Sequence, residues 1–357
     1  MSQIKFTVKP DFFLVLRNRI DGYFKEHNIK KTGDYRLYSK SVILFTALIA
    51  LYTILVFFTP SSIILSLVLC VMMGVTLAAI GFNVMHDGAH GSYSTNSAVN
   101  TIMGFSLNVM GGNVYIWKQK HNVNHHSFTN IEGMDDDIDI QPFIRVHTAQ
   151  KKNIFHAFQH FSWILLYGTT YIFWVFYNDF YKYFKGKISE YAPMPKMNLK
   201  EHLNFWFSKI FYTVIFIVIP GFMVGWIPML IGYLVISYVT GLLISVVFQL
   251  AHVVEKADFV DPVSTEFQVE DEWAVHQLKT TANFATGSKF LNWLLGGLNF
   301  QVEHHLFPRI SHVHYAKLNK IVKATCKEYH VDYKEYPTMF QALKSHVKHL
   351  KVVGQAA

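Results

Sequence analysis

Histidines gather in four short groups whose residue type and spacing suit metal binding. The groups are HDGAH (86–90), HNVNHH (121–126), QLAH ending at residue 252, and QVEHH (301–305). Imidazole nitrogen binds iron, copper and zinc, whereas magnesium and calcium prefer oxygen, so a nitrogen-rich site indicates a transition metal. Together the groups hold eight of the 19 histidines: His86, His90, His121, His125, His126, His252, His304 and His305.

The spacing within the groups predicts more than one metal ion. Residues four apart share one face of a helix, so His86 and His90 can reach one ion, and His121 and His125 repeat that spacing. His126 is rotated by about 100 degrees from its neighbour and can reach a second ion, as can one member of the adjacent pair in QVEHH. Eight imidazoles exceed what one ion accepts, so we predict a site for two metal ions.

Two long uncharged runs supply the elements that must position these histidines. No Asp, Glu, Lys or Arg occurs from Ser41 to His86 or from Ile210 to Val254. Each run exceeds the roughly 20 helical residues that cross a bilayer once, so each predicts two spans and a turn. Pro60 divides the first run, and Pro220 to Pro228 divide the second, because proline and glycine end helices. The predicted spans are residues 41–58, 62–85, 208–225 and 228–252.

The distribution of basic residues predicts the orientation. Both hairpin turns are uncharged, whereas the two termini and the middle segment carry Lys and Arg, which favour the cytoplasmic side. We expect both termini and the histidines on that side, with residues 1–40 and 321–357 as flanking segments of a membrane domain at 41–320. Residues 98–117 and 153–178 are expected as interfacial or partly buried helices. The predicted fold class is an all-α membrane protein with two hairpins and a cytoplasmic helical cap.

Composition agrees with this class and excludes others. Hydrophobic residues make up 51% of the chain and the mean hydropathy is +0.22, which favours a membrane protein. The net charge of +8 suits an anionic membrane surface, nucleic acid or an acidic cofactor, and charge alone does not choose among them. With only Cys70 and Cys326, the chain cannot build a disulfide framework or a cysteine-based zinc or iron–sulfur site.

Three of the groups carry a family resemblance. HDGAH (86–90), HNVNHHSFTN (121–130) and QVEHHLFP (301–308) resemble the three histidine boxes of the integral-membrane fatty acid desaturases. The likeness extends from about residue 40 to 320. The third box begins with Gln301, as in the front-end and bacterial linoleoyl-CoA-type desaturases, which place a double bond between an existing one and the carboxyl end. Front-end enzymes usually carry a fused cytochrome b5 domain with an HPGG motif, which this sequence lacks.

The resemblance implies the ligand set. The seven histidines of the three boxes are then iron ligands, and Gln301 is a ligand directly or through water. His252 matches the extra histidine that completes the cage in the acyl-CoA desaturases. That branch has Asn four residues earlier, where this chain has Phe248, and Gln249 is the candidate that replaces it through water. Metal-bound histidines usually donate their other N–H to a carboxylate or carbonyl, and the expected partners are Asp87, Asp135, Asp137 and Glu303.

The resemblance also implies a reaction and its partners. Two iron ions would activate O2 to remove two hydrogens from a long-chain acyl group linked to coenzyme A or to a lipid, with zinc able to replace iron in overexpressed protein. A separate electron donor is expected, such as ferredoxin or cytochrome b5 with its reductase. Membrane lipids are expected partners and nucleic acid is not. Lys118 and Lys120 are candidates for binding the substrate headgroup.

The residues leave two other functions open. A hydroxylase on the same scaffold would use the same ligands and add oxygen to the chain. A non-catalytic membrane carrier of metal or haem would also need histidines, but it should place them near the bilayer midplane or pair them across spans. The predicted histidines lie at span ends, which favours the desaturase.

Overall fold

Four long apolar helices dominate the computed structural model, which describes residues 4–7 and 11–356. Each is long enough and apolar enough to cross a bilayer, which confirms the predicted fold class. The first and third begin earlier than predicted, because each helix continues through charged residues such as Lys40 and Lys209 at its polar end. The four span Tyr35–Phe57, Ile63–His90, Leu199–Val224 and Trp226–His252.

Two of these helices contain shorter elements. The second is α3 followed by a π-helical turn and α4, and the third contains another π-helical turn, whereas the first and fourth are single helices. The third helix continues through Pro220, which lies in the first turn of its last segment, and ends before Gly225. The bounds are α2 Tyr35–Phe57, α3 Ile63–Ile80, η1 Gly81–Met85, α4 His86–His90, α10 Leu199–Thr213, η5 Val214–Val218, α11 Ile219–Val224 and α12 Trp226–His252.

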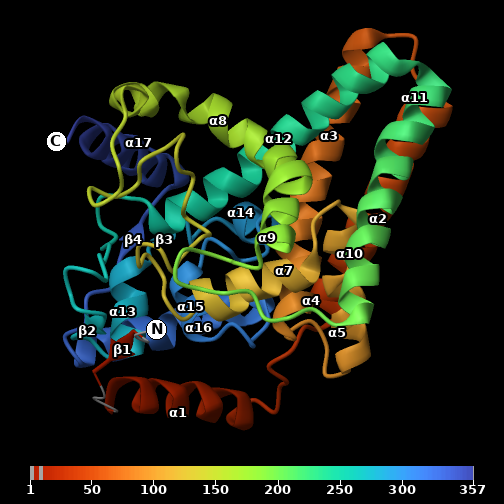
Figure 1. Cartoon of the computed structure of the whole chain (residues 1–357). Helices are drawn as coiled ribbons and strands as arrows, with labels where there is room; N and C mark the ends of the chain where they lie inside the picture. Colours follow the sequence, from red (N-terminus) through yellow and green to blue (C-terminus); the bar gives the residue numbers. More distant parts are fainter. Residues whose placement is uncertain (1–3, 8–10, 357) are drawn as a thin grey trace.

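Glycines allow close contact between the spans. A Cβ added at Gly74 of α3 would lie 2.8 Å from the carbonyl oxygen of Ile236 in α12. A Cβ at Gly241 of α12 would lie 2.7 Å from the carbonyl oxygen of Gly168. Small residues at such crossings let helix backbones approach in the membrane, where packing replaces the hydrophobic effect between helices. Figure 1 shows the two hairpins side by side, with α11 near their tip.

A middle segment joins the hairpins, and together with residues 11–26 and 273–355 it forms the part of the molecule that we call the cap. Residues 98–117 form three short helices whose second half is buried, and residues 153–178 form a nearly continuous helix. That helix exposes Phe155, Phe158 and Phe161, as an interfacial helix would, and its place at the interface stays a prediction. The bounds are α5 Ser97–Gly104, α6 Ser106–Val109, α7 Val114–Lys118, η2 Gln119–His125, η3 Ile154–Phe158, α8 Gln159–Phe173, η4 Trp174–Asn178 and α9 Asp179–Lys185.

Both ends of the chain pack into the cap rather than extending from it. Leu16 and Ile20 of α1 are fully buried against the core of the later helices. His346 of α17 bonds to the carbonyl of Val253 at 2.6 Å, directly after the last span. The bounds are α1 Asp11–Glu26, α13 Trp273–Thr280, α14 Lys289–Leu294, α15 Gln301–Leu306, η6 His312–His314, α16 Tyr315–Glu328 and α17 Met339–Gln355.

Two short parallel strand pairs tie distant segments of the cap together. Lys5–Phe6 (β1) pairs with Gln268–Val269 (β2), and Asn283–Phe284 (β3) pairs with Glu335–Tyr336 (β4). The first pair fixes the amino-terminal segment to the loop after the last span. The second pair fixes the segment before α17 beside the one that leads to α15.

Candidate metal centre

Spans and cap helices deliver the histidines to one buried place. His86 and His90 lie on α4 at the end of the second span, and His252 is the last residue of α12. His121 and His125 lie on the π-helical turn η2, and His126 follows it. The remaining two, His304 and His305, lie on α15. All eight are buried, so the expected convergence is observed.

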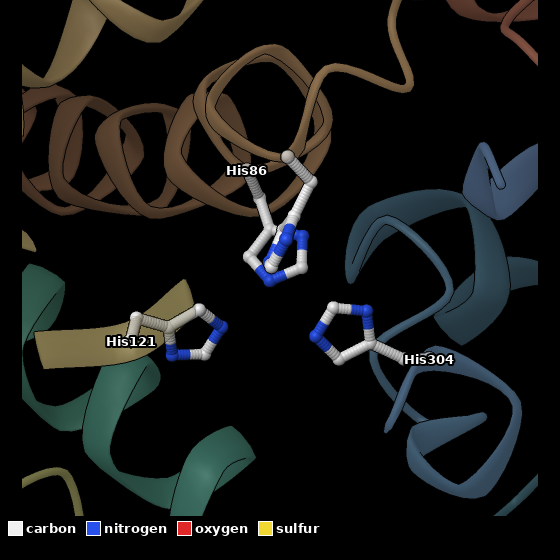
Figure 2. A group of neighbouring side chains, drawn as sticks. His86, His121 and His304 are labelled. Atoms are coloured by element: carbon white, nitrogen blue, oxygen red, sulfur yellow. The ribbon is translucent and has the colours of Figure 1, made fainter. Parts of the chain in front are cut away.

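The side chains form two groups of donors. The ring nitrogens of His86, His90, His121 and His304 lie within 4.8 Å of one another, as do those of His125, His252 and His305. Figure 2 shows the rings of His86, His121 and His304 pointing toward one another from three separate elements. The adjacent pair on α15 is thus divided between the groups, as the sequence predicted.

The second histidine box contributes to both groups. His121 lies with the first group and His125 with the second, and these two histidines also form a third possible metal group with Asp137, so the expectation that they share an ion stays a prediction. Their rings stack with centroids 5.1 Å apart, so this turn serves both groups. The turn is π-helical, with the N–H of His126 donating to the carbonyl of His121 at 3.1 Å, and such turns are frequent at functional sites.

His126 lies between the two groups. Its ring centroid is 4.5 Å from that of His304 and 4.6 Å from that of His305. Its Nε2 lies 3.3 Å from Nε2 of His121. It can therefore face either group, and its role near a second ion stays a prediction.

Unpaired nitrogens show that this cluster fits metal ions. Among the described residues, Nε2 of five of these histidines is buried without a hydrogen-bond partner: His90, His125, His252, His304 and His305. Buried polar atoms nearly always have a partner, so five unpaired nitrogens that converge fit a bound metal ion. Burial lowers the pKa of His126, His304 and His305 well below its ordinary value, and the neutral ring is the form that binds metal.

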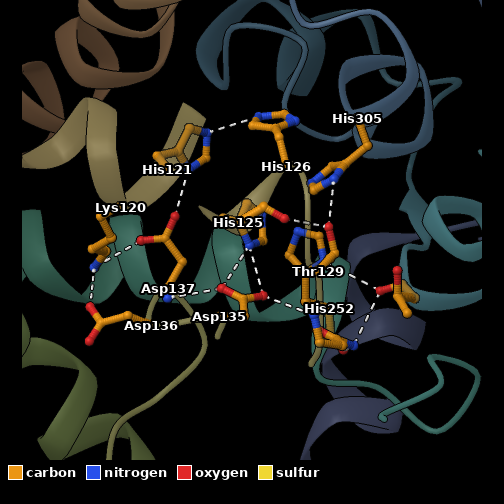
Figure 3. Close-up of polar contacts among 12 residues, drawn as sticks. Lys120, His121, His125, His126, Thr129, Asp135, Asp136, Asp137, His252 and His305 are labelled. Carbon is orange, nitrogen blue, oxygen red and sulfur yellow. Dashed lines mark hydrogen bonds and ion pairs between the residues drawn. The ribbon is translucent and has the colours of Figure 1, made fainter. Parts of the chain in front are cut away.

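Carboxylates orient the rings of the second box. Nδ1 of His121 donates to Oδ2 of Asp137 at 2.6 Å, and Nδ1 of His125 donates to Asp135 at 2.9 Å (Figure 3). Lys120 lies 2.8 Å from the other oxygen of Asp137. Although burial opposes it, Lys120 and His121 hold the pKa of Asp137 well below its ordinary value, so this acceptor is charged. These are two of the four carboxylates expected to contact the cage.

The other two carboxylates bond elsewhere, which corrects their expected role. Asp87 accepts from Ser311 at 2.6 Å and pairs with His312 at 3.1 Å. Glu303 accepts from Asn283, Asn319 and Tyr333, and burial raises its pKa to about 7. Each is next to a cage histidine in a helix, and a step of about 100 degrees turns neighbouring side chains to different faces.

Neutral partners that the sequence did not reveal orient two further rings. Nδ1 of His305 donates to Oε1 of Gln277 at 2.8 Å, and the same oxygen accepts from Thr129 at 2.8 Å. Nδ1 of His304 lies 3.1 Å from the hydroxyl of Tyr315. Such residues are common in many roles, and no local motif in the sequence distinguishes them.

The remaining predicted residues surround the cage at different distances. Gln301 and Gln249 are buried, and each has an Oε1 without a partner among the described residues. The ring of Phe248 lies 4.9 Å from His125 and 5.1 Å from His252, in the place where another branch carries Asn.

The two lysines predicted to bind the substrate headgroup differ in their surroundings. Lys118 is half-buried, and this burial lowers the pKa of its ammonium group. Lys120 is held in ion pairs with Asp136 and Asp137, so it is not available to a headgroup as predicted.

An apolar cavity of about 510 Å³ lies between the two hairpins. All four spans line it, with Tyr52, Met73 and Leu77 on one side and Phe216 and Ile236 on the other. Leu77 also belongs to the same core as Trp117, whose ring stacks on His121 at 4.4 Å. Apolar side chains therefore connect the cavity to the histidines.

Together the fold and the site define a class: a membrane protein with a buried histidine cluster, at the ends of its spans, that could hold metal ions. Residues 61–337 match the family described as fatty acid desaturase, and the chain belongs to that family. The expected desaturase activity is therefore confirmed, and the protein is an oxidoreductase that desaturates fatty acyl chains.

Relatives cover nearly the whole chain. The sn-1 linoleoyl-lipid 6-desaturase of Synechocystis sp. is 35% identical, over 100% of this chain and 99% of the relative. The acyl-lipid (8-3)-desaturase of Physcomitrium patens is 39% identical, over 96% of this chain and 72% of the relative. The sn-1 linoleoyl-lipid 6-desaturase of Arthrospira platensis is 34% identical, over 98% and 94%.

Proposed function

We propose that this desaturase acts on lipid-linked acyl chains and places the new double bond between an existing one and the carboxyl end. The names of the relatives support both points, since they denote acyl-lipid enzymes that include 6-desaturases. The Gln at the start of the third box supports the front-end position.

We propose two iron ions as the metals. The observation that carries this is the pair of buried imidazole groups with unpaired Nε2 atoms. When bound, iron would supply the redox chemistry that removes hydrogen from an unactivated methylene, which zinc, having no redox states, does not supply. The proposed ligands are His86, His90, His121 and His304 for one ion and His125, His252 and His305 for the other, with His126 and Gln301 at either.

The protein positions the rings and excludes water. Asp135, Asp137 and Gln277 each accept a hydrogen bond from an Nδ1, which fixes Nε2 as the atom that faces the metal. Burial of the cage keeps bulk water from the reacting carbons. The cavity between the hairpins would hold the apolar part of the chain beyond the new double bond.

The stoichiometry requires an external electron donor. A CH2–CH2 unit, O2, two protons and two electrons become a CH=CH unit and two water molecules. The substrate supplies only half of the electrons that reduce O2, so a carrier must supply the rest. We propose a separate protein such as ferredoxin or cytochrome b5 with its reductase.

We also propose that the cage and both chain ends face the cytoplasm. The hairpin turns at 58–62 and 225 carry no charge, while the cap holds most of the Lys and Arg, which supports this orientation. Labelling of single cysteines placed in α1 and in the hairpin turn would test it. Accessibility of α1 from the opposite side would contradict it.

The decisive experiment is expression in a host that is fed linoleate, with fatty-acid profiling of each lipid class. The expected product lacks two hydrogens relative to linoleate, and derivatisation should locate its new double bond nearer the carboxyl end. The product should appear in glycerolipids earlier than in the coenzyme A esters. A product that gained oxygen would support the hydroxylase instead. A matched His304→Ala variant should insert in the membrane and form no product.

A further inference from the structure

One face of α16 carries lysines without partners. Lys317, Lys320 and Lys327 are exposed, and none forms an ion pair or hydrogen bond within the part of the chain that the structure describes. At about 100 degrees per residue these three lie within roughly 80 degrees around the helix, so they form one stripe. We call them the basic stripe. Lys323, beside it, is neutralised by Glu335.

A groove runs beside the basic stripe, between α1 and α16. Its volume is about 730 Å³, and its lining includes Val15, Gly22, Ile321 and Ala324. Lys320 and Arg19 stand on its walls, together with Glu26. Arg19 is fixed by two bonds to Glu328, at 2.8 and 3.0 Å, so the two helices form one preformed surface. A groove lined by apolar residues and bordered by polar and charged ones has the usual anatomy of a protein interface.

Helix α16 links this surface to the histidine cluster through direct contacts. α16 begins at Tyr315, whose hydroxyl lies 3.1 Å from Nδ1 of His304. The buried side of the same helix, through Leu318 and Val322, packs in one core with Val302 of α15. The basic stripe therefore starts two residues after the side chain that touches a cage histidine.

Lipid is a poor candidate for covering the basic stripe. Figure 1 shows α1 and α16 at the end of the molecule away from α11 and the hairpin tips. A second set of exposed lysines, Lys185, Lys196 and Lys200, instead lies beside exposed apolar residues such as Leu199 and Leu203, where a headgroup layer fits. The two basic surfaces thus have different surroundings.

We propose that the basic stripe and its groove dock an acidic one-electron carrier protein. Complementary charge steers association and orients the partner, and docking here would bring a redox group over the helix that begins at Tyr315. Each docking event delivers one electron, and two events complete one double bond. This inference rests on the proposed need for a separate donor.

Binding of probe proteins to the purified full-length chain tests the proposal without using product formation. The probes are oxidised plant-type ferredoxin and the soluble domain of cytochrome b5. In the triple variant Lys317→Glu, Lys320→Glu and Lys327→Glu, the probe that binds the wild-type chain should bind at least about tenfold more weakly and lose most of its salt dependence. Carbodiimide should cross-link wild-type Lys320 to carboxylates of that probe.

The matched control reverses three other charges: Lys185→Glu, Lys196→Glu and Lys200→Glu. If the basic stripe is the docking site, this control should bind the probe within about twofold of wild type. Nonspecific attraction depends on net charge alone and would instead weaken binding equally in both variants. Equal weakening, no weakening in the first variant, or binding of neither probe to the wild-type chain would overturn the proposal. The proposal would also be overturned if the first variant no longer bound added phosphatidylglycerol but still bound the probe protein. Fatty-acid profiles of the same proteins report on desaturation separately.

Discussion

Replacing Asp137 by Asn tests whether the carboxylate partners of the cage histidines control metal binding. The carboxylate accepts from Nδ1 of His121 at 2.6 Å and pairs with Lys120 at 2.8 Å. The amide keeps the shape, loses the charge and can present an N–H toward the ring. A hydrogen bond to a charged group is worth about 1.5–3 kcal/mol. At about 1.4 kcal/mol per factor of ten, metal affinity should fall by roughly 10- to 150-fold.

The neighbouring residue provides the control. Asp136 bonds to Lys182 at 2.7 Å and lies 3.6 Å from Lys120, and it contacts no cage histidine in the described structure. Asp136→Asn removes the same charge from the same loop, so it should change metal affinity by less than about threefold. Affinity is measured by competition with a chelator followed by elemental analysis, beside product formation.

The reasoning fails if Asp137→Asn keeps wild-type affinity. It also fails if both variants lose metal to the same extent, because a general loss of negative charge would then explain the effect. Far-ultraviolet circular dichroism in detergent should show the same helix content for all three proteins, which separates a local effect from unfolding.

Three further outcomes are expected. Leu77→Trp should fill the cavity between the hairpins and reduce conversion of long acyl chains more than of shorter ones, measured by profiling a host fed both; an equal loss on all chains would contradict a chain-binding cavity. Leu16→Ala should remove a fully buried contact of α1 and destabilise the cap by about 2–5 kcal/mol, seen as a lower Tm. Gly74→Leu should separate α3 from α12, because its Cβ would lie 2.8 Å from backbone, and an unchanged Tm would contradict this packing.

The spans and the histidines could be predicted from the sequence because few residue types satisfy either constraint. A bilayer excludes charge over a long run, so the uncharged stretches after Ser41 and Ile210 located both hairpins. Imidazoles at short spacing have few structural explanations, and all eight meet in the cage. Helix bounds were less predictable, because Lys40 bonds to Asn83 within the protein at 2.6 Å and the helix continues past it.

The partners of the histidines could be predicted only in part. Asp135 and Asp137 follow the second box closely, so proximity in the chain indicated them, while the same argument failed for Asp87 and Glu303 because adjacent helical residues diverge. Gln277 reaches His305 across 28 positions, a pairing that only the folded chain creates.

The clustered histidines come from two sources, the spans and the cap, which explains why the cap needs so many fixed contacts. The histidines at 86, 90 and 252 are placed by rigid spans, whose packing through Gly74 leaves little freedom. The other five come from the cap, and four of them form a hydrogen bond through Nδ1, to Asp135, Asp137, Gln277 or Tyr315. Ring orientation must be held closely for several nitrogens to meet. Hydrogen bonds at Nδ1 therefore fix the ring orientation of the cap histidines, whereas helix packing fixes the position of the span histidines.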